Sequence, residues 1–182
     1  MMSPVRRSRL FVTGASGSGT TTLARAVADH WAVPHADVDD YFWVPSDPPY
    51  AEKRSEAERV ALMERLFLPR EGWVLSGSML GWGDAVVARC AAVVFLTLSP
   101  TERLRRLEAR ESVRQVDRAV DEPAWAAFIA WARGYDDPAF EGRSRVAHEN
   151  WLGSLHCPVL RLDSASPREV LRDQVLAWVP ES

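Results

Sequence analysis

The feature that most constrains this chain is a glycine-rich loop between an apolar run and an amphipathic stretch. Residues 9–14 read RLFVTG, a short apolar run ending in glycine, which predicts a buried β-strand. In the stretch after the loop, Leu23, Val27 and Trp31 recur every four residues and predict a helix over residues 20–31. A strand, a glycine loop and a helix N-terminus in succession can bind phosphate through backbone N–H groups.

The loop reads GASGSGTTT and fits the phosphate-binding pattern G-x-x-x-x-G-K-[ST] at Gly14, Gly19 and Thr21. Thr20 stands where the pattern has lysine, the mobile cation for the β and γ phosphates. We expect the Thr21 hydroxyl to bind Mg²⁺. The expected phosphate-binding residues are Gly14, Ala15, Ser16, Gly17, Ser18, Gly19, Thr20, Thr21 and Thr22.

Two other interpretations of the loop are a plain structural turn and a dinucleotide-binding loop. The dinucleotide pattern requires a third glycine where Thr22 stands, and its short-chain dehydrogenase variant requires glycine in place of Ser18 and Thr20. The Tyr-x-x-x-Lys pair of those dehydrogenases is absent, because Tyr50 and Lys53 are one residue too close. These departures count against hydride transfer.

Strand-like runs and helical periodicities alternate along the rest of the chain. Further strands are predicted within 33–43, 72–78, 91–98 and 157–163, and further helices at 55–68, from 99 onward and at 166–178. This alternation predicts an α/β fold with a parallel sheet covered on both faces. We expect a single domain over residues 1–182, in which the charged, strand-free region 111–145 forms a helical lid.

Acidic side chains gather where the second predicted strand ends, at Asp37, Asp39 and Asp40. Parallel sheets bind ligands at this edge, where a carboxylate can accept a hydroxyl proton or orient Mg²⁺. Asp39 is the main candidate for both roles, and turn formation or helix capping is the alternative. The aromatic run 41–43 that follows is expected either to line an acceptor pocket or to pack in the core. The small residues 76–78 would let a substrate approach.

Arginines supply almost all the positive charge, since Lys53 is the only lysine. Four of them share one face of the helix expected from residue 99, namely Arg103, Arg106, Arg110 and Arg114. Such a stripe is either an ordinary solvated face or a source of charge for a transferring phosphoryl group. The candidate catalytic cations are Arg110, Arg114, Arg143 and Arg145.

The composition argues against several classes of partner. A formal net charge of -3 counts against a nucleic-acid-binding surface, and no apolar run approaches the roughly 20 residues that span a bilayer. The arginines near the N-terminus precede a run interrupted by Gly14 and Ser16, which does not fit a signal peptide. We expect a cytoplasmic monomer or homodimer. Cys90 and Cys157 are expected to be structural thiols.

The ordered set of motifs resembles the small P-loop kinases, that is, the nucleoside-monophosphate kinase group with its shikimate- and gluconate-kinase-like relatives. The stretches that carry the resemblance are GASGSGTTT, DVDD, WVLSGS, VVFLTLSPTERLRRLEAR and VLRLD. The chain also resembles bacterial proteins labelled AAA-family ATPases or adenylate-kinase-like, which share GSGTTT, SGS…GWGD and RSR…HE.WL. Bacterial phosphoribulokinases carry a similar lysine-free loop.

The resemblance implies a three-layer P-loop NTPase sandwich with a five-stranded parallel sheet in the order 2-3-1-4-5 and an arginine-bearing lid. It implies Mg-ATP as phosphoryl donor, a nucleotide or small hydroxylated metabolite as acceptor, and Asp39 as base or metal organiser. Either an arginine or, from the acceptor side, Lys53 would then replace the missing lysine. The alternative function is a nucleotide-binding switch or regulatory module without efficient turnover.

Overall fold

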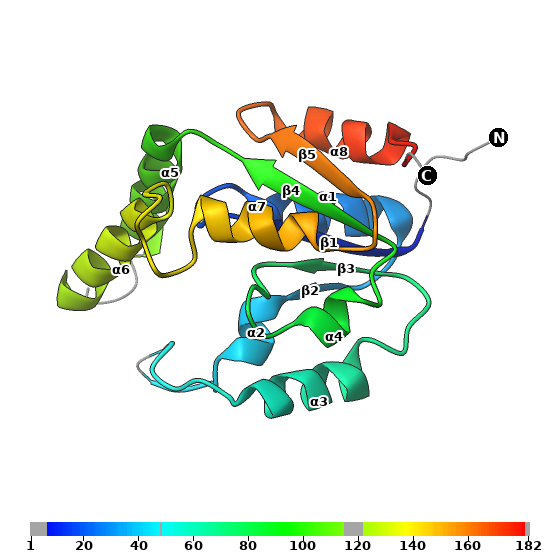
Figure 1. Cartoon of the computed structure of the whole chain (residues 1–182), viewed down its shortest axis with the longest axis horizontal. Coiled ribbons are helices and arrows are strands. Elements are labelled where there is room, and N and C mark those ends of the chain that lie inside the picture. The colour runs from blue at the N-terminus through cyan, green and yellow to red at the C-terminus, as the bar shows by residue number, and fades with distance from the viewer. Residues whose placement is uncertain (1–6, 48, 115–121, 181–182) are drawn as a thin grey trace.

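A computed structural model describes residues 7–47, 49–114 and 122–180, with only the backbone of Arg114. Its centre is one parallel sheet in the strand order β2-β3-β1-β4-β5 (Figure 1). The strands are β1 Arg9–Gly14, β2 His35–Asp37, β3 Trp73–Ser76, β4 Ala92–Thr97 and β5 Val159–Asp163. The predicted strands and their order are confirmed.

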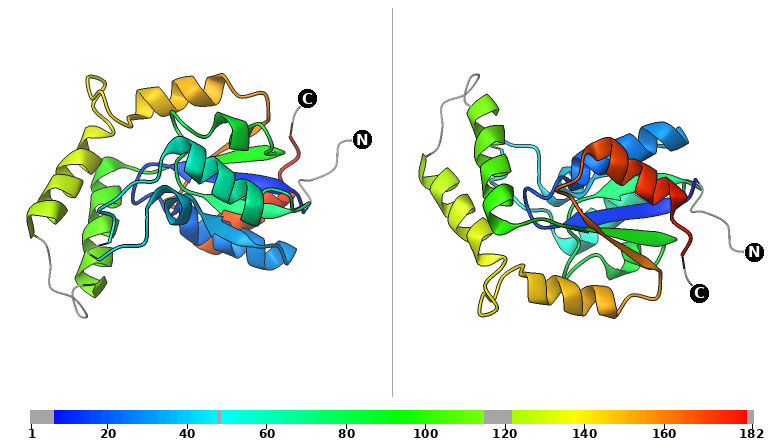
Figure 2. Two further views of the ribbon diagram at one scale, coloured as in Figure 1. Left: turned by 90° about the horizontal axis from the view of Figure 1, so that it is seen from below. Right: turned by 90° about the horizontal axis from the view of Figure 1, so that it is seen from above.

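Helices cover both faces of the sheet and complete three layers (Figure 2). They are α1 Thr20–Trp31, α2 Val38–Phe42, α3 Glu56–Leu66, α4 Asp84–Val87, α5 Pro100–Arg114, α6 Glu122–Gly134, α7 Arg145–Gly153 and α8 Arg168–Ala177. Side chains of β1 alternate between the two layers. Leu10 and Val12 pack in the cluster that contains α1 and α8, whereas Phe11 packs in the cluster that contains residues of α3, α4 and α7. Cys90 is a free thiol buried within this second cluster, and Cys157 is a free thiol packed against it.

The acidic segment after β2, which the sequence places only at the end of the second strand, is a short helix, α2. Asp37 is its N-cap, and its Oδ1 accepts a hydrogen bond from the Asp39 N–H at 3.1 Å. Asp37 therefore starts a helix that no apolar periodicity in the sequence predicts. The short helix α4 lies in a stretch for which the sequence predicts no helix.

Two helices, α5 and α6, lie side by side at the end of the sheet where β1 and β4 finish (Figures 1 and 2). Leu107, Ile129 and Ala132 form their shared apolar contact. Residues 115–121 of the predicted lid lie outside the described residues. Within the described ranges, no helix combines the length and the hydropathy needed to cross a membrane.

Candidate active site

The glycine loop between β1 and α1 packs tightly against α5 and β4. Gly17 has φ +84°, and a Cβ there would lie 2.6 Å from the carbonyl oxygen of Arg103. A Cβ on Gly14 would lie 2.6 Å from the carbonyl oxygen of Leu96. Space therefore excludes a larger residue at both positions, and at Gly17 the left-handed backbone conformation favours glycine as well.

Polar groups inside the loop fit a bound phosphate chain. The Ser18 hydroxyl is buried and has no hydrogen-bond partner among the described residues. Helix α1 begins directly after Gly19, which offers no side chain as a cap. The first N–H groups of such a helix lack intrahelical acceptors and attract anions. The loop thus presents hydrogen-bond donors without acceptors where the sequence predicts phosphate binding.

Thr21, in the first turn of α1, and Asp37, at the end of β2, form the centre of a polar network. The Thr21 hydroxyl donates to Asp37 Oδ2 at 2.8 Å, and the Ser76 hydroxyl donates to the same oxygen at 3.2 Å. With its proton engaged, the Thr21 oxygen keeps lone pairs for a cation. In the described part of the chain, no three acidic, histidine or cysteine side chains form a ready metal site. A Mg²⁺ ion here would fit the usual pattern of few protein ligands completed by phosphate and water.

Asp39 lies on the exposed side of α2 among other charged groups. Partial loss of hydration, together with the nearby Asp37 carboxylate, raises the pKa of Asp39. Arg143 and Arg110 oppose this shift, which places both cations within electrostatic range of the carboxylate. The structure therefore brings together three of the predicted site residues.

Arg143 links the Asp39 side of the site to the glycine loop. Its Nη2 donates to the Ser16 hydroxyl at 2.6 Å, and its guanidinium lies 4.8 Å from the centre of the Trp131 ring. Its Nε is buried without a hydrogen-bond partner among the described residues. Burial lowers the pKa of Arg143, and the nearby Asp39 carboxylate offsets this shift only in part. Arg143 thus contacts the glycine loop, in which Thr20 stands at the position of the usual lysine.

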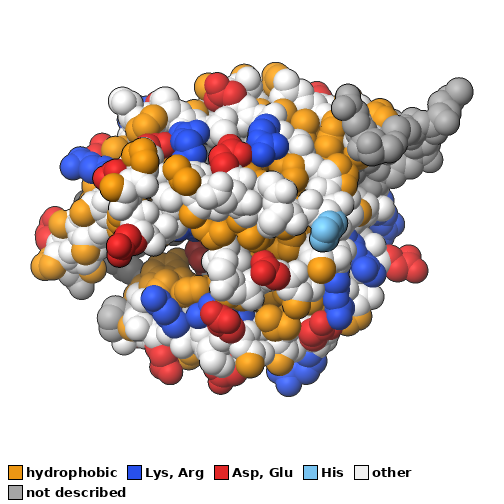
Figure 3. Space-filling model, viewed as in Figure 1, with side chains coloured by type: hydrophobic (Ala, Val, Ile, Leu, Met, Phe, Trp, Pro, Cys, Tyr) orange, Lys and Arg blue, Asp and Glu red, His pale blue; other side chains and the backbone are white. Residues whose placement is uncertain are grey.

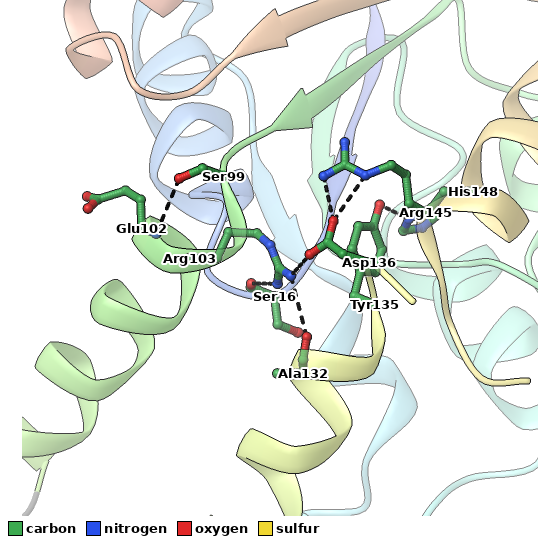
Figure 4. Close-up of polar contacts among 9 residues, drawn as sticks. All are labelled: Ser16, Ser99, Glu102, Arg103, Ala132, Tyr135, Asp136, Arg145 and His148. Carbon is green, nitrogen blue, oxygen red and sulfur yellow. Dashed lines mark hydrogen bonds and ion pairs between the residues drawn. The ribbon is translucent and has the colours of Figure 1, made fainter. Parts of the chain in front are cut away.

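Arg145 has a different environment from Arg143, because it pairs with Asp136 (Figure 4). Its Nε and Nη2 donate to Asp136 Oδ1 at 3.0 and 2.6 Å. The other carboxylate oxygen accepts from Arg103, whose Nη1 also donates to the Ser16 carbonyl at 3.0 Å. Arg103 is only 1% exposed. Asp136 therefore holds the arginine that supports the backbone of the glycine loop.

The arginine stripe of α5 is not one surface. Arg103 is buried on the same face as Leu107, four residues later, a spacing that could have revealed its burial. Arg106 donates to the Ser164 carbonyl at 2.9 Å, and Arg110 is exposed. The side chain of Arg114 lies outside the described residues, so its predicted role stays a prediction.

A buried hydrogen bond joins the segment after α6 to α7. The Tyr135 hydroxyl lies 2.9 Å from His148 Nδ1 (Figure 4). Burial, with a smaller effect of Arg143, lowers the pKa of His148 to about 3. His148 is consequently neutral at physiological pH, and its hydrogen bond joins the first turn of α7, which begins at Arg145, to Tyr135.

The aromatic side chains of residues 41–43, after Asp39, differ in burial. Tyr41 is buried and packs against Phe67, with ring centres 6.5 Å apart. Phe42 instead contacts Trp82 at 6.1 Å and the guanidinium of Arg59. Sequence reasoning missed Arg59, since an arginine within an amphipathic helix carries no distinguishing pattern. Figure 3 shows a hollow between α7 and the segment after α2, with hydrophobic and basic side chains on its walls.

The sheet order, together with a glycine loop between β1 and α1, defines a P-loop kinase-like fold. The chain belongs to a family described as AAA domain, whose model matches residues 10–123. It is 34% identical over 177 residues to "Uncharacterized protein YqaC" from Bacillus subtilis (strain 168), covering 95% of this chain and 98% of that protein.

Solved kinase structures share the fold. A gluconokinase from Sinorhizobium meliloti 1021 has a TM-score of 0.55 at 20% identity, covering 95% of this chain and 92% of that one. A sugar kinase from Janibacter sp. HTCC2649 has a TM-score of 0.52 at 17% identity, covering 94% of both chains. A shikimate kinase from Aquifex aeolicus vf5 has a TM-score of 0.50 at 18% identity, covering 92% and 93%. These similarities concern the fold.

Proposed function

We propose that this protein is a Mg-ATP-dependent kinase that phosphorylates a hydroxyl group of a small metabolite or nucleotide. One observation carries the proposal: Arg143 contacts Ser16 of the glycine loop at 2.6 Å and acts electrostatically on Asp39. A phosphate-binding loop, a cation and a carboxylate are the groups that phosphoryl transfer requires.

The donor side of the proposed site consists of residues 14–22. Their backbone N–H groups and the N-terminus of α1 would bind the phosphates, with Thr21 as the metal ligand. Asp37 accepts the hydrogen bond of the Thr21 hydroxyl. Asp39 lies within electrostatic range of Arg143 and Arg110. When bound, Mg²⁺ would neutralise charge on the β and γ phosphates.

The transfer needs a proton acceptor and compensation for negative charge. Asp39 would accept the hydroxyl proton as the acceptor oxygen bonds to the γ phosphorus and the bond from phosphorus to ADP breaks. Its raised pKa makes it a stronger base than an ordinary aspartate. Arg143 would stabilise the charge that develops on the transferring group, with Arg110 as a second cation. Arg145 would act through Asp136, by positioning the segment that carries Arg143.

The experiment that tests the function measures ADP release from Mg-ATP in the presence of sugars, sugar acids, hydroxy acids and nucleotides. We expect one acceptor class to stimulate release. Asp39→Asn should lower that turnover by about 100-fold or more, because general-base catalysis is lost, and leave ATP affinity unchanged. Asp40→Asn, in the neighbouring exposed residue, is the matched control and should retain turnover.

Two results would contradict the proposal. Unchanged turnover in Asp39→Asn would exclude Asp39 as the base. Tight ATP binding without acceptor-stimulated release across the panel would instead favour a nucleotide-binding switch or regulatory module.

A further inference from the structure

His35 of β2 extends the polar network around Asp37 by one further side chain. Its Nε2 lies 2.9 Å from the Ser76 hydroxyl oxygen, and that hydroxyl donates to Asp37 Oδ2 at 3.2 Å. The Thr21 hydroxyl donates to the same carboxylate oxygen at 2.8 Å. These four side chains, which we call the His35 network, connect His35 to the proposed metal ligand through continuous hydrogen bonds.

The sheet fixes the positions of the His35 network. Asp37 lies opposite Ser76 in the parallel pairing of β2 with β3. The alternate residues Ala36 and Leu75 pack in the other layer, so the side chains of His35, Asp37 and Ser76 share the face of the sheet that α1 covers. Ser76 is fully buried, and water therefore does not compete for its hydroxyl.

The His35 network has one consistent arrangement of protons. Ser76 has a single hydroxyl proton, which it donates to Asp37, so His35 Nε2 must donate an N–H to Ser76 Oγ. In the opposite arrangement the Ser76 proton would turn to His35, and lone pairs of Ser76 and Asp37 would face each other across 3.2 Å. The Asp37 carboxylate thus accepts from both hydroxyls and from the Asp39 N–H.

His35 can act as this donor in either of its charge states. Burial lowers the pKa of His35, and the nearby Asp37 carboxylate offsets this shift only in part. The neutral ring carries its proton on Nε2, and protonation at low pH adds a second proton on Nδ1. The hydrogen bond to Ser76 therefore does not depend on the charge of the ring.

We propose that His35 is a positioning residue that prepares the Thr21 hydroxyl for Mg²⁺. By donating to Ser76, His35 directs the Ser76 proton to Asp37 and so orients the carboxylate that accepts the Thr21 hydrogen bond. The Thr21 oxygen then keeps its lone pairs for a metal ion, as partners behind a metal ligand commonly ensure. The inference rests on the Mg-ATP binding of the proposed function, and it adds a residue outside the glycine loop that sets metal affinity.

Calorimetry of ATP binding, with Mg²⁺ and with EDTA in its place, tests this inference without turnover. The measured quantity is the Mg²⁺ factor, by which Mg²⁺ tightens ATP binding. His35→Leu should reduce this factor by about tenfold or more and leave metal-free ATP affinity unchanged. His35→Gln, whose amide N–H can reach Ser76, should restore most of the factor. His30→Leu, in an exposed histidine of α1, is the matched control and should keep the wild-type factor.

A double-mutant cycle separates positioning from a general loss of structure. Ser76→Ala removes the link between His35 and Asp37 and should reduce the Mg²⁺ factor at least as much as His35→Leu. The double variant should lose no more than Ser76→Ala alone. If His35→Leu does not fold, His35→Asn replaces it, because the shorter amide does not reach Ser76. A purely structural histidine would lower Tm and metal-free ATP affinity and leave the Mg²⁺ factor unchanged.

A wild-type Mg²⁺ factor in His35→Leu would overturn the inference, as would additive losses in the double variant or a wild type whose ATP binding Mg²⁺ does not tighten. The proposed function fails separately. A Mg²⁺ factor that depends on His35, without any acceptor-stimulated ADP release, would refute the kinase and leave the role of His35. Acceptor-stimulated release with an unchanged factor in His35→Leu would do the reverse.

Discussion

At the scale of single residues, Thr20 stands where the loop pattern has lysine. The question is therefore which other residue supplies that positive charge. The described contacts place Arg143 on Ser16, although 127 positions separate them in the chain. The sequence indicates that a lysine is absent and that arginines are the available cations. It does not indicate which arginine, because this contact depends on the path of the segment after α6, where no periodicity exists.

The environment of Asp39 predicts how activity depends on pH. A general base acts only when deprotonated, so kcat/KM should fall as the pH decreases through the pKa of Asp39. Dehydration and Asp37 raise that pKa, and the acidic limb should therefore lie above the ordinary range of an aspartate. A pH profile of kcat/KM measures it.

The control for this profile is Arg110→Gln. Arg110 lowers the pKa of Asp39, so its replacement should move the acidic limb to higher pH. A limb that does not move, or one at or below the ordinary aspartate range in the wild type, would contradict the assignment of Asp39.

At the scale of elements, strands and long helices follow from local patterns, but their functional contacts do not. The residues of β1 and α1 coincide with the predicted 9–14 and 20–31, because each segment carries its own apolar pattern. The helix α2 was not predictable in this way, since only the cap at Asp37 starts it. Arg103 was expected on a charged surface, and its burial depends on Asp136 from a separate loop.

Asp136 therefore has a testable structural role. Asp136→Ala would leave the buried Arg103 without its counterion and should lower the free energy of unfolding by about 3 kcal/mol. Urea denaturation measures this change. Asp137→Ala removes an adjacent exposed carboxylate, whose one side-chain hydrogen bond among the described residues comes from the Ala139 N–H, and should cost much less. Equal effects of the two substitutions would show that Asp136 does not support Arg103.

At the scale of the whole molecule, the parallel sheet explains why distant segments meet. The carboxyl ends of β1, β2 and β3 lie at one edge, so the glycine loop, α2 and the loop after β3 become neighbours. Alternating patterns predict the parallel sheet, whereas the strand order 2-3-1-4-5 came from the resemblance to P-loop kinases. The segment after α6 then brings Arg143 to the same edge from the far end of the chain.

The most direct test of the central claim is the turnover of Arg143→Ala, measured with Mg-ATP and the acceptor that the panel identifies. Loss of a preorganised cation should lower kcat by about 100-fold or more. Adding Thr20→Lys to this variant restores the cation at the position of the loop pattern and should recover part of the loss. Retention of wild-type kcat by Arg143→Ala would contradict the claim that Arg143 supplies the charge of the missing lysine.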